Sequence, residues 1–188
     1  MDLKEKIQRY IPYNEQEATD KKELLRILTC DENYFVRENL VAHFTAAGWV
    51  VSPDRKKTLL AYHNLYDSWA WLGGHADGEQ NLLLAALKEV CEESGLQEIH
   101  PVTEDIFSLE ILPVFGHEKK GKYVPSHIHL NVTFLFEADP TAEIHNKPDE
   151  NSKVSWFDLK EVSSVSTEPW FVERIYRKLI EKVEGGIH

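Results

Sequence analysis

The sequence is poor in cysteine and in long apolar runs, and each shortage excludes a class of protein. Its 188 residues include only two cysteines, which is too few for a disulfide framework and fits a reducing compartment. No apolar run approaches the roughly 20 residues that a membrane-spanning helix needs. Met1 is not followed by the basic and apolar segments of a signal peptide. These absences predict a soluble, cytoplasmic protein.

Basic residues are also in the minority. Lysine and arginine number 21 against 32 aspartates and glutamates, which gives a formal net charge of −11. An acidic surface repels both a phosphate backbone and anionic lipid, so we expect neither a nucleic-acid polymer nor a membrane as partner. A small phosphorylated ligand remains compatible with this charge, because a bound divalent metal can invert the local sign.

The composition changes near Val41 and divides the chain into two parts. Residues 1–40 are polar and helical in pattern, with an apolar stripe that runs from Leu24 to Leu28. We expect them to form a helical extension and residues 41–188 to form the main domain, since about 150 residues is an ordinary domain length. The extension could make the contact of a homodimer, or it could cap a ligand cleft.

Hydrophobic patterning in the main domain predicts short strands mixed with helices. We expect helices over residues 81–94 and 169–184, and strands over residues 43–51, 58–63, 69–72, 107–115, 126–137 and 153–157. Residues 138–152 carry prolines and asparagines and are typical of a loop, and residues 33–39 predict a turn and a short helix. Strands around a loop and a helix indicate an α/β or α+β fold.

The densest chemistry lies on the predicted helix over residues 81–94. Glu89, Glu92 and Glu93 gather on one helical face, at spacings of three and four residues. Like charges at this spacing destabilise a helix by a few tenths of a kcal/mol, and the helix dipole opposes anions near the C-terminus. A cation would offset this strain, and carboxylate oxygens suit Mg²⁺ or Mn²⁺. The alternative is a solvated charged face without a ligand.

Glycines on both sides of this helix complete a longer pattern. The segment resembles the Nudix box, G-x5-E-x7-R-E-U-x-E-E-x-G-U, in which U is a bulky aliphatic residue. Gly74 falls on the first glycine, and the later positions are matched by Glu89, Val90, Glu92, Glu93, Gly95 and Leu96. Lys88 stands in place of the arginine and lacks its planar fork. Gln80 stands in place of the first glutamate, with Glu79 one residue early.

The resemblance implies the Nudix α/β/α sandwich, in which a mixed sheet lies between helices and the box forms a loop–helix–loop. It also implies hydrolysis of a small molecule, a nucleoside diphosphate linked to another moiety. Mg²⁺ or Mn²⁺ would be bound by Glu89, Glu92 and Glu93 with Gly74, and Lys88 would belong to the same catalytic set. A base in this family often comes from a later loop, where Glu150 is the candidate. Glu150 could equally be an ordinary loop carboxylate.

Histidines and a tryptophan outside the box are candidates for substrate contacts. His127 and His129 alternate with apolar residues, so both project from one strand face and could contact phosphate or ribose. A solvated strand face is the alternative, and a zinc site built on His-x-His lacks an accompanying cysteine or HExxH motif. His75 could hydrogen-bond a ligand or fix its loop, whereas Trp71 could stack on a base or pack in the core.

Two other functions fit the same scaffold. A non-catalytic ligand-binding or regulatory module is conceivable, because Lys88 and Gln80 depart from the box. An isomerase of isoprenoid diphosphates would need a cysteine and a glutamate in the cleft. Neither Cys30 in the extension nor Cys91 on the box helix is obviously placed there. The substrate itself depends on pocket contacts that the sequence does not reveal.

Overall fold

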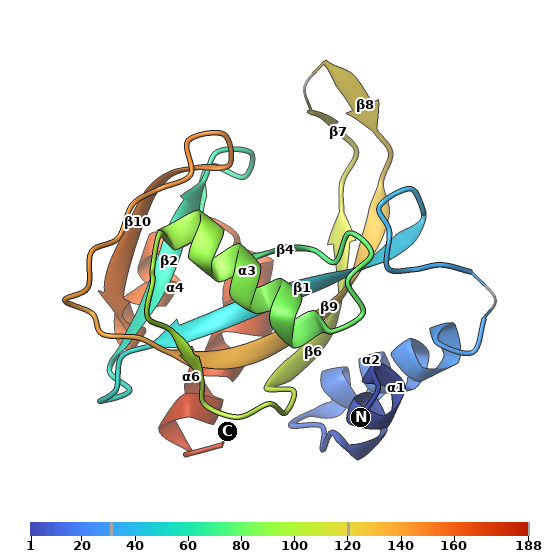
Figure 1. The fold of residues 1–188 in the computed structure, drawn as a ribbon, viewed down its shortest axis with the longest axis horizontal. Helices are drawn as coiled ribbons and strands as arrows, with labels where there is room; N and C mark the ends of the chain where they lie inside the picture. Colours follow the sequence, from blue (N-terminus) through green and yellow to red (C-terminus); the bar gives the residue numbers. More distant parts are fainter. Residues whose placement is uncertain (31, 120, 188) are drawn as a thin grey trace.

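A mixed β-sheet organises the chain, and helices cover both of its faces (Figure 1). The computed structural model describes residues 1–30, 32–119 and 121–187. Eight strands form the sheet in the order β10-β2-β1-β9-β5, with β3 beside β2, β4 beside β1 and β6 beside β9. They are β1 (Ala42–Val51), β2 (Lys57–His63), β3 (Ser68–Ala70), β4 (Leu72–His75), β5 (His100–Pro101), β6 (Ser108–Val114), β9 (His127–Glu137) and β10 (Asn151–Asp158).

The main helices lie on opposite faces of this sheet. Helix α3 crosses one face, and the C-terminal helical segment lies against the other (Figure 1). The helices are α1 (Leu3–Arg9), α2 (Glu15–Ile27), α3 (Leu82–Ser94), α4 (Val162–Val165), α5 (Pro169–Phe171) and α6 (Arg177–Glu184), with a 3-10 turn over Leu159–Glu161 and a π-helical turn over Val172–Tyr176. The predicted α/β/α sandwich with a mixed sheet and a helical N-terminal extension is confirmed. None of the helices in the described ranges is long and apolar enough to cross a membrane.

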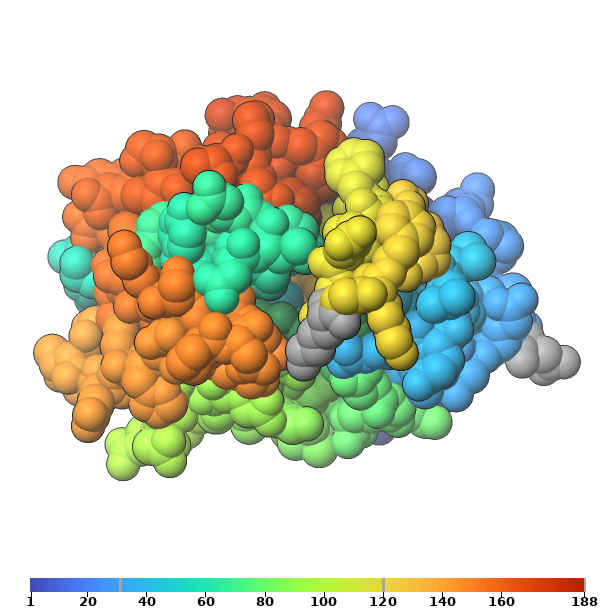
Figure 2. Space-filling view, turned by 90° about the horizontal axis from the view of Figure 1, so that it is seen from above, coloured from blue at the N-terminus to red at the C-terminus, as the bar shows by residue number. Residues whose placement is uncertain are grey.

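The surface shown in Figure 2 has a hollow between three segments that connect strands. A separate hairpin, β7 (His117–Lys119) and β8 (Lys122–Val124), projects from the body. Seen from above, a hollow opens between this hairpin, the turn that joins β2 to β3, and the loop that precedes β10 (Figure 2). The hairpin was not predicted from the sequence, and its strands are only three residues long.

Strands β1 and β9 run parallel through the middle of the sheet. Every residue of β1 is buried, because helices cover both faces, and such strands appear in a sequence as nearly continuous apolar runs. Alternate side chains enter two different cores: Phe44 and Ala46 join the cluster that contains α3, and Trp49 joins the cluster that contains α6. Gly48 allows close packing of α3 on β1, since a Cβ at this position would collide with Val90.

Three predicted elements differ from the structure. The expected strand over 69–72 is two strands, β3 and β4, interrupted at Trp71. Residues 33–39 form turns but not the expected short helix, because carbonyls of Tyr34 and Phe35 accept hydrogen bonds from Phe44 and from Gly78 instead of from a following turn. The last strand begins at residue 151, two residues early, where a bulge allows the chain to pair with β2.

Helix α2 covers the edge strand β6. The Ile111 N–H donates to the Asp20 carboxylate at 3.2 Å, so part of an edge that would otherwise expose unpaired backbone groups is satisfied by a side chain. Ile7 of α1 and Leu24 of α2 are fully buried in the same core cluster as α3. The N-terminal helices therefore pack against the sheet.

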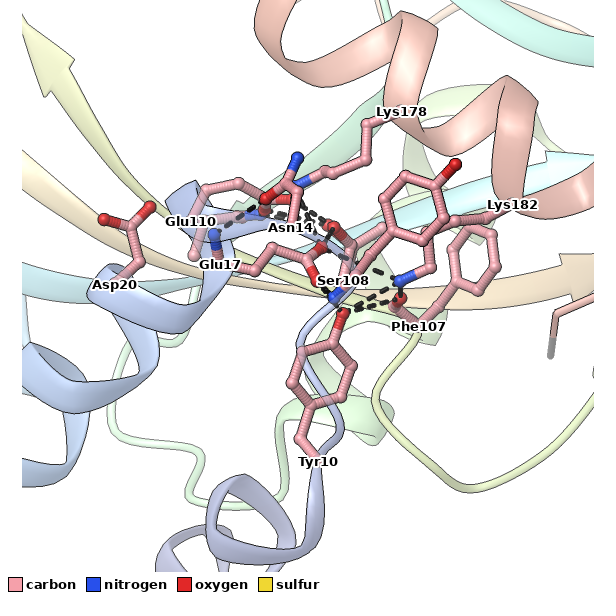
Figure 3. A network of polar contacts seen from close by, with 12 residues as sticks. Tyr10, Asn14, Glu17, Asp20, Phe107, Ser108, Glu110, Lys178 and Lys182 are labelled. Atoms are coloured by element: carbon pink, nitrogen blue, oxygen red, sulfur yellow. Dashed lines mark hydrogen bonds and ion pairs between the residues drawn. The ribbon is translucent and has the colours of Figure 1, made fainter.

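A buried ionic network joins α2, β6 and α6 (Figure 3). Lys178 Nζ lies 3.0 Å from Glu17 Oε1 and 2.8 Å from Glu110 Oε1. Lys182 Nζ lies 3.7 Å from Glu17 Oε1 and donates to the Tyr10 hydroxyl at 2.8 Å. Burial acts to raise the pKa of Glu17, but the charges of Lys178 and Lys182 outweigh it and lower that pKa. The two lysines balance the formal charge of the two glutamates.

Candidate active site

Helix α3 presents one apolar face to β1 and a neighbouring acidic face to the end of β4. Leu82, Ala86 and Val90 are buried against β1, which leaves the box glutamates along the neighbouring stripe. The helix ends at Gly95, whose φ of 73° is left-handed and therefore favours glycine. The acidic face thus ends where the chain turns sharply away.

The end of β4 is held against this acidic face by close backbone contacts. Glu93 is buried, and its Oε2 accepts a hydrogen bond from the Gly73 N–H at 2.9 Å. The Glu89 carboxylate lies directly against Gly74, where an added Cβ would fall 2.5 Å from Glu89 Cδ. Only glycine permits this approach, so the glycine pair and the glutamates form one unit although 15 and 20 residues separate them.

Carboxyl groups are concentrated at this place. Burial raises the pKa of Glu93 to about 8, and the charges of Glu89 and Glu150 add to the effect. Burial also raises the pKa of Glu89, again with a contribution from Glu150. Burial first, and neighbouring carboxylates second, disfavour the ionised form of these groups, and a cation that accepts their hard oxygen donors would offset that cost.

A lysine from the loop before β10 meets the outer edge of the acidic face. Lys147 Nζ lies 2.9 Å from Glu92 Oε2 and 3.2 Å from Glu150 Oε2. The hydrogen bond from Lys147 lowers the pKa of Glu92. Burial opposes the charge of Lys147, but its bonds to the two glutamates outweigh this and raise its pKa. Glu150 therefore lies beside the box, as the sequence-based candidate for the base requires.

Asn151 fixes this loop to α3. It is fully buried, its Nδ2 donates to the Glu93 carbonyl at 3.1 Å, and its Oδ1 accepts from the Lys147 N–H at 3.1 Å. Sequence reasoning missed both Asn151 and Lys147. They lie more than 50 residues after the box, in a segment whose prolines and asparagines indicated only a loop.

Comparison with known proteins agrees with this geometry. The family model described as NUDIX domain matches residues 42–182, which include the whole sheet and the acidic helix. The chain belongs to the Nudix family. No curated protein sequence gives a significant match.

Solved Nudix structures share the fold at low sequence identity. The Ap4A hydrolase of C. elegans in a binary complex has a TM-score of 0.53 and 19% identity, over 76% of this chain and 96% of that one. The Nudix hydrolase RenU of M. smegmatis has a TM-score of 0.55 and 16% identity, over 78% and 88%. The dihydroneopterin triphosphate pyrophosphohydrolase of E. coli has a TM-score of 0.52 and 15% identity, over 72% and 95%. These likenesses show the fold.

Two positions of the Nudix box depart from the family pattern, and both are exposed. The side chain of Lys88 is 71% exposed, and its Nζ lies 3.7 Å from Glu92 Oε1. Gln80 is exposed, and the neighbouring Glu79 accepts a hydrogen bond from the Asn81 N–H at 2.7 Å, which serves the start of α3. In this structure Lys147, rather than Lys88, makes the closer ion pair with Glu92.

An ion pair holds the loop between β4 and α3 of this Nudix domain. Arg37 forms a two-pronged ion pair with Asp77, with Nε at 2.7 Å from Oδ1. Asp77 has a φ of 47°, so the turn adopts a left-handed conformation that the ion pair supports. No spacing pattern predicts this pair, because 40 residues separate its members.

The predicted histidine face exists but is not solvated. His127 and His129 lie on one face of β9, and His127 is only 9% exposed. Burial lowers the pKa of His129 to about 2 and that of His75 to about 3, so both imidazoles are neutral near pH 7. His127 is thus buried, His75 and His129 are half-buried, and the ring of His129 lies beside the rings of His75 and His127.

Trp71 packs on the face of the sheet opposite to the box glutamates. Its ring meets Tyr176 edge-on with centroids 5.9 Å apart and Phe171 at 6.4 Å, in the cluster that contains α6. Cys91 is partly buried against the other cluster, and Cys30 is exposed near the end of α2. The structure thus brings the box glutamates and Glu150 together, and leaves Trp71 and the cysteines in other surroundings.

Proposed function

We propose that this Nudix protein is a metal-dependent hydrolase that cleaves the pyrophosphate bond of a nucleoside diphosphate linked to another moiety. The observation that carries the proposal is the convergence of the box glutamates with Glu150 at one edge of α3. Among the described residues, Lys147 is the only cation that contacts two of these carboxylates. Four clustered carboxylates, of which Glu93 is buried, are compatible with a bound cation and a phosphorylated substrate.

The donor set fits Mg²⁺ or Mn²⁺. Nudix hydrolases in general use such divalent ions, and hard cations bind through oxygen ligands. Glu89, Glu92 and Glu93 would hold the ion, together with the backbone of Gly74. When bound, the ion would neutralise charge on the pyrophosphate and make water a stronger nucleophile. The pKa of Glu93, raised to about 8 by burial and neighbouring carboxylates, supports this assignment because a cation would relieve both effects.

The remaining groups of the site have roles that follow from their contacts. The Gly73 N–H holds one oxygen of Glu93 at 2.9 Å and so orients the other oxygen away from the backbone. Glu150 is partly exposed at the rim, where it can accept a proton from the attacking water. Lys147 holds Glu150 beside Glu92, and Asn151 holds the loop that carries both.

Phosphate release from a panel of diphosphate-linked compounds tests the activity. A coupled phosphatase reports the products, and each assay is repeated with Mg²⁺, with Mn²⁺ and with a chelator. We expect turnover of one class of compound, lost on chelation, which would also name the substrate. Absence of phosphate release from every compound in the panel would contradict the proposed hydrolase activity.

Substitution of the metal ligands tests the site. Glu93→Gln keeps the size of the side chain and removes its charge, and it should reduce kcat about 100-fold or more, since metal catalysis supplies several kcal/mol. Glu98→Gln, at an exposed position just after α3, is the matched control and should be fully active. Unchanged thermal unfolding of Glu93→Gln would show that the loss is not misfolding. Full activity of both Glu93→Gln and Glu92→Gln would contradict the metal assignment.

One observation favours a second function, a Nudix-fold module that binds its ligand without hydrolysis. Lys88 is exposed where the family has an arginine, and Gln80 is exposed where the family has a glutamate. Binding of a diphosphate ligand without phosphate release would support this function. Restoring Lys88→Arg and Gln80→Glu in the same chain should then restore turnover.

A further inference from the structure

Four histidine side chains meet near one end of the central strands. His43 of β1 lies directly beside His129 of β9 in the parallel register, and His75 ends β4. The coordinating nitrogens of His43, His75 and His129 all lie within 4.8 Å of one another. His127 adjoins this group, with its Nε2 at 3.1 Å from His129 Nε2.

This cluster is separate from the carboxylate site. Along β1, Phe44 and Ala46 face the core that contains α3, so His43 and Thr45 project from the opposite face of the sheet. The ring of His75 lies 5.0 Å from that of His43 and belongs to the same side. The glutamates of α3 therefore lie across the sheet from the imidazoles, although His75 follows Gly74 directly in the sequence.

Two of the rings are oriented by backbone carbonyls. His43 Nδ1 lies 2.9 Å from the Asn39 carbonyl, and His127 Nδ1 lies 2.8 Å from the Pro125 carbonyl. A carbonyl only accepts, so each Nδ1 carries the proton and each Nε2 presents a lone pair toward the cluster. When a histidine binds a metal through one ring nitrogen, the N–H of its other ring nitrogen usually donates to a carbonyl, a carboxylate or water.

The hydrogen bonds among the described residues leave one ring nitrogen of the cluster without a partner. A hydrogen bond from His129 Nε2 to His127 Nε2 accounts for one pair. His43 is 4% exposed, however, and its Nε2 is buried without a hydrogen-bond partner among the residues that the structure describes. A buried lone pair without a donor is unfavourable, and a cation among the rings would satisfy it.

We propose that His43, His75 and His129 bind one transition-metal ion of the Zn²⁺ class, and that the His127 ring turns toward the ion as a fourth ligand when it binds. Zinc bound to imidazole has metal–nitrogen distances of about 2.0–2.1 Å, which place tetrahedral ligand nitrogens about 3.3 Å apart. The 3.1 Å between the Nε2 atoms of His127 and His129 is already close to that spacing. Four protein ligands make a closed, structural site, which joins the end of β4 to β1 and β9.

The two sites should differ in the metal that they select. Imidazole nitrogen suits zinc, cobalt and nickel, whereas carboxylate oxygen suits magnesium and manganese. The test therefore uses the full chain without a polyhistidine tag, stripped of metal and titrated with Zn²⁺ in the presence of excess Mg²⁺. We expect one equivalent of tightly bound Zn²⁺ and a higher Tm. Zinc X-ray absorption should show a shell of imidazole nitrogens at about 2.0–2.1 Å.

Variants assign the ion to the cluster. His129→Asn should weaken Zn²⁺ binding by about 100-fold or more, which is at least the effect of losing an outer-sphere partner. The exposed His100→Asn is the matched control and should bind Zn²⁺ as the unmodified chain does. Loss of Zn²⁺ in Glu93→Gln but not in His129→Asn would overturn the proposal, and so would the absence of tight Zn²⁺ binding. If His129→Asn does not fold, an oxygen-dominated shell around zinc in the unmodified chain overturns it equally.

Discussion

Replacing Lys178 by methionine tests whether the buried ionic network fastens the N-terminal helices to the sheet. Methionine keeps much of the apolar stem but removes the ammonium group that lies 3.0 Å from Glu17 and 2.8 Å from Glu110. The network then holds two buried carboxylates and one lysine, so one negative charge stays buried without compensation.

The magnitude follows from this burial. Breaking a buried ion pair by removing one partner costs about 3–5 kcal/mol, and we expect this decrease in the free energy of unfolding. For a chain of this size, it corresponds to a decrease in Tm of about 6–20 °C. Lys160→Met is the matched control, because its side chain is 83% exposed and its Nζ lies 3.9 Å from Asp158. An exposed pair of this kind contributes about 1 kcal/mol at most.

Urea denaturation followed by tryptophan fluorescence measures these differences. The double variant Lys178→Met with Glu110→Gln loses one charge of each sign, so it should be more stable than the sum of the single effects by about 0.5–3 kcal/mol. A decrease below about 1 kcal/mol for Lys178→Met would contradict the stabilising role of the network, because that is the range of an exposed pair. Strict additivity in the double variant would refute it as well.

Two further predictions concern the network and the acidic site. The pKa of Glu17 is lower in the folded chain than in the unfolded chain. Its contribution to the free energy of unfolding is therefore complete above about pH 4.3 and is lost as the pH falls through the folded-state pKa. Denaturation between about pH 3 and 7 should therefore give a steeper acid limb for the unmodified chain than for Glu17→Gln, and parallel limbs would contradict this. Gly74→Ala places a methyl group 2.5 Å from Glu89 Cδ and must displace that carboxylate. Mn²⁺ affinity, measured by calorimetry, should fall about tenfold or more; unchanged affinity would mean that Glu89 does not hold the ion.

The acidic helix could be predicted because its information is local. A helix places residues three and four positions apart on one face whatever surrounds it, so Glu89, Glu92 and Glu93 were grouped by spacing alone. The left-handed turn at Gly95 likewise needs only a glycine in the right place. Glu150 was chosen through the family resemblance, and the structure brings it within reach of Lys147 and the box.

Other features depend on contacts between distant segments, which spacing does not report. Lys147 and Asn151 reach α3 only because the loop before β10 folds across its C-terminus. No pattern in the sequence predicts a role for His43, because only the pairing of β1 with β9 places it beside His129.

The family, the mixed α/β architecture, the acidic face of the box helix and the glycine that ends it could all be predicted from the amino-acid sequence. These properties come from periodicity and from backbone requirements that act within a few residues. Three features arise only in the folded chain: the Lys178 network that joins α2 to β6 and α6, the closer ion pair of Glu92 with Lys147 than with Lys88, and the partly buried cluster of histidines. Burial and charge compensation depend on which residues are close in space, and strand register and loop closure determine which residues these are.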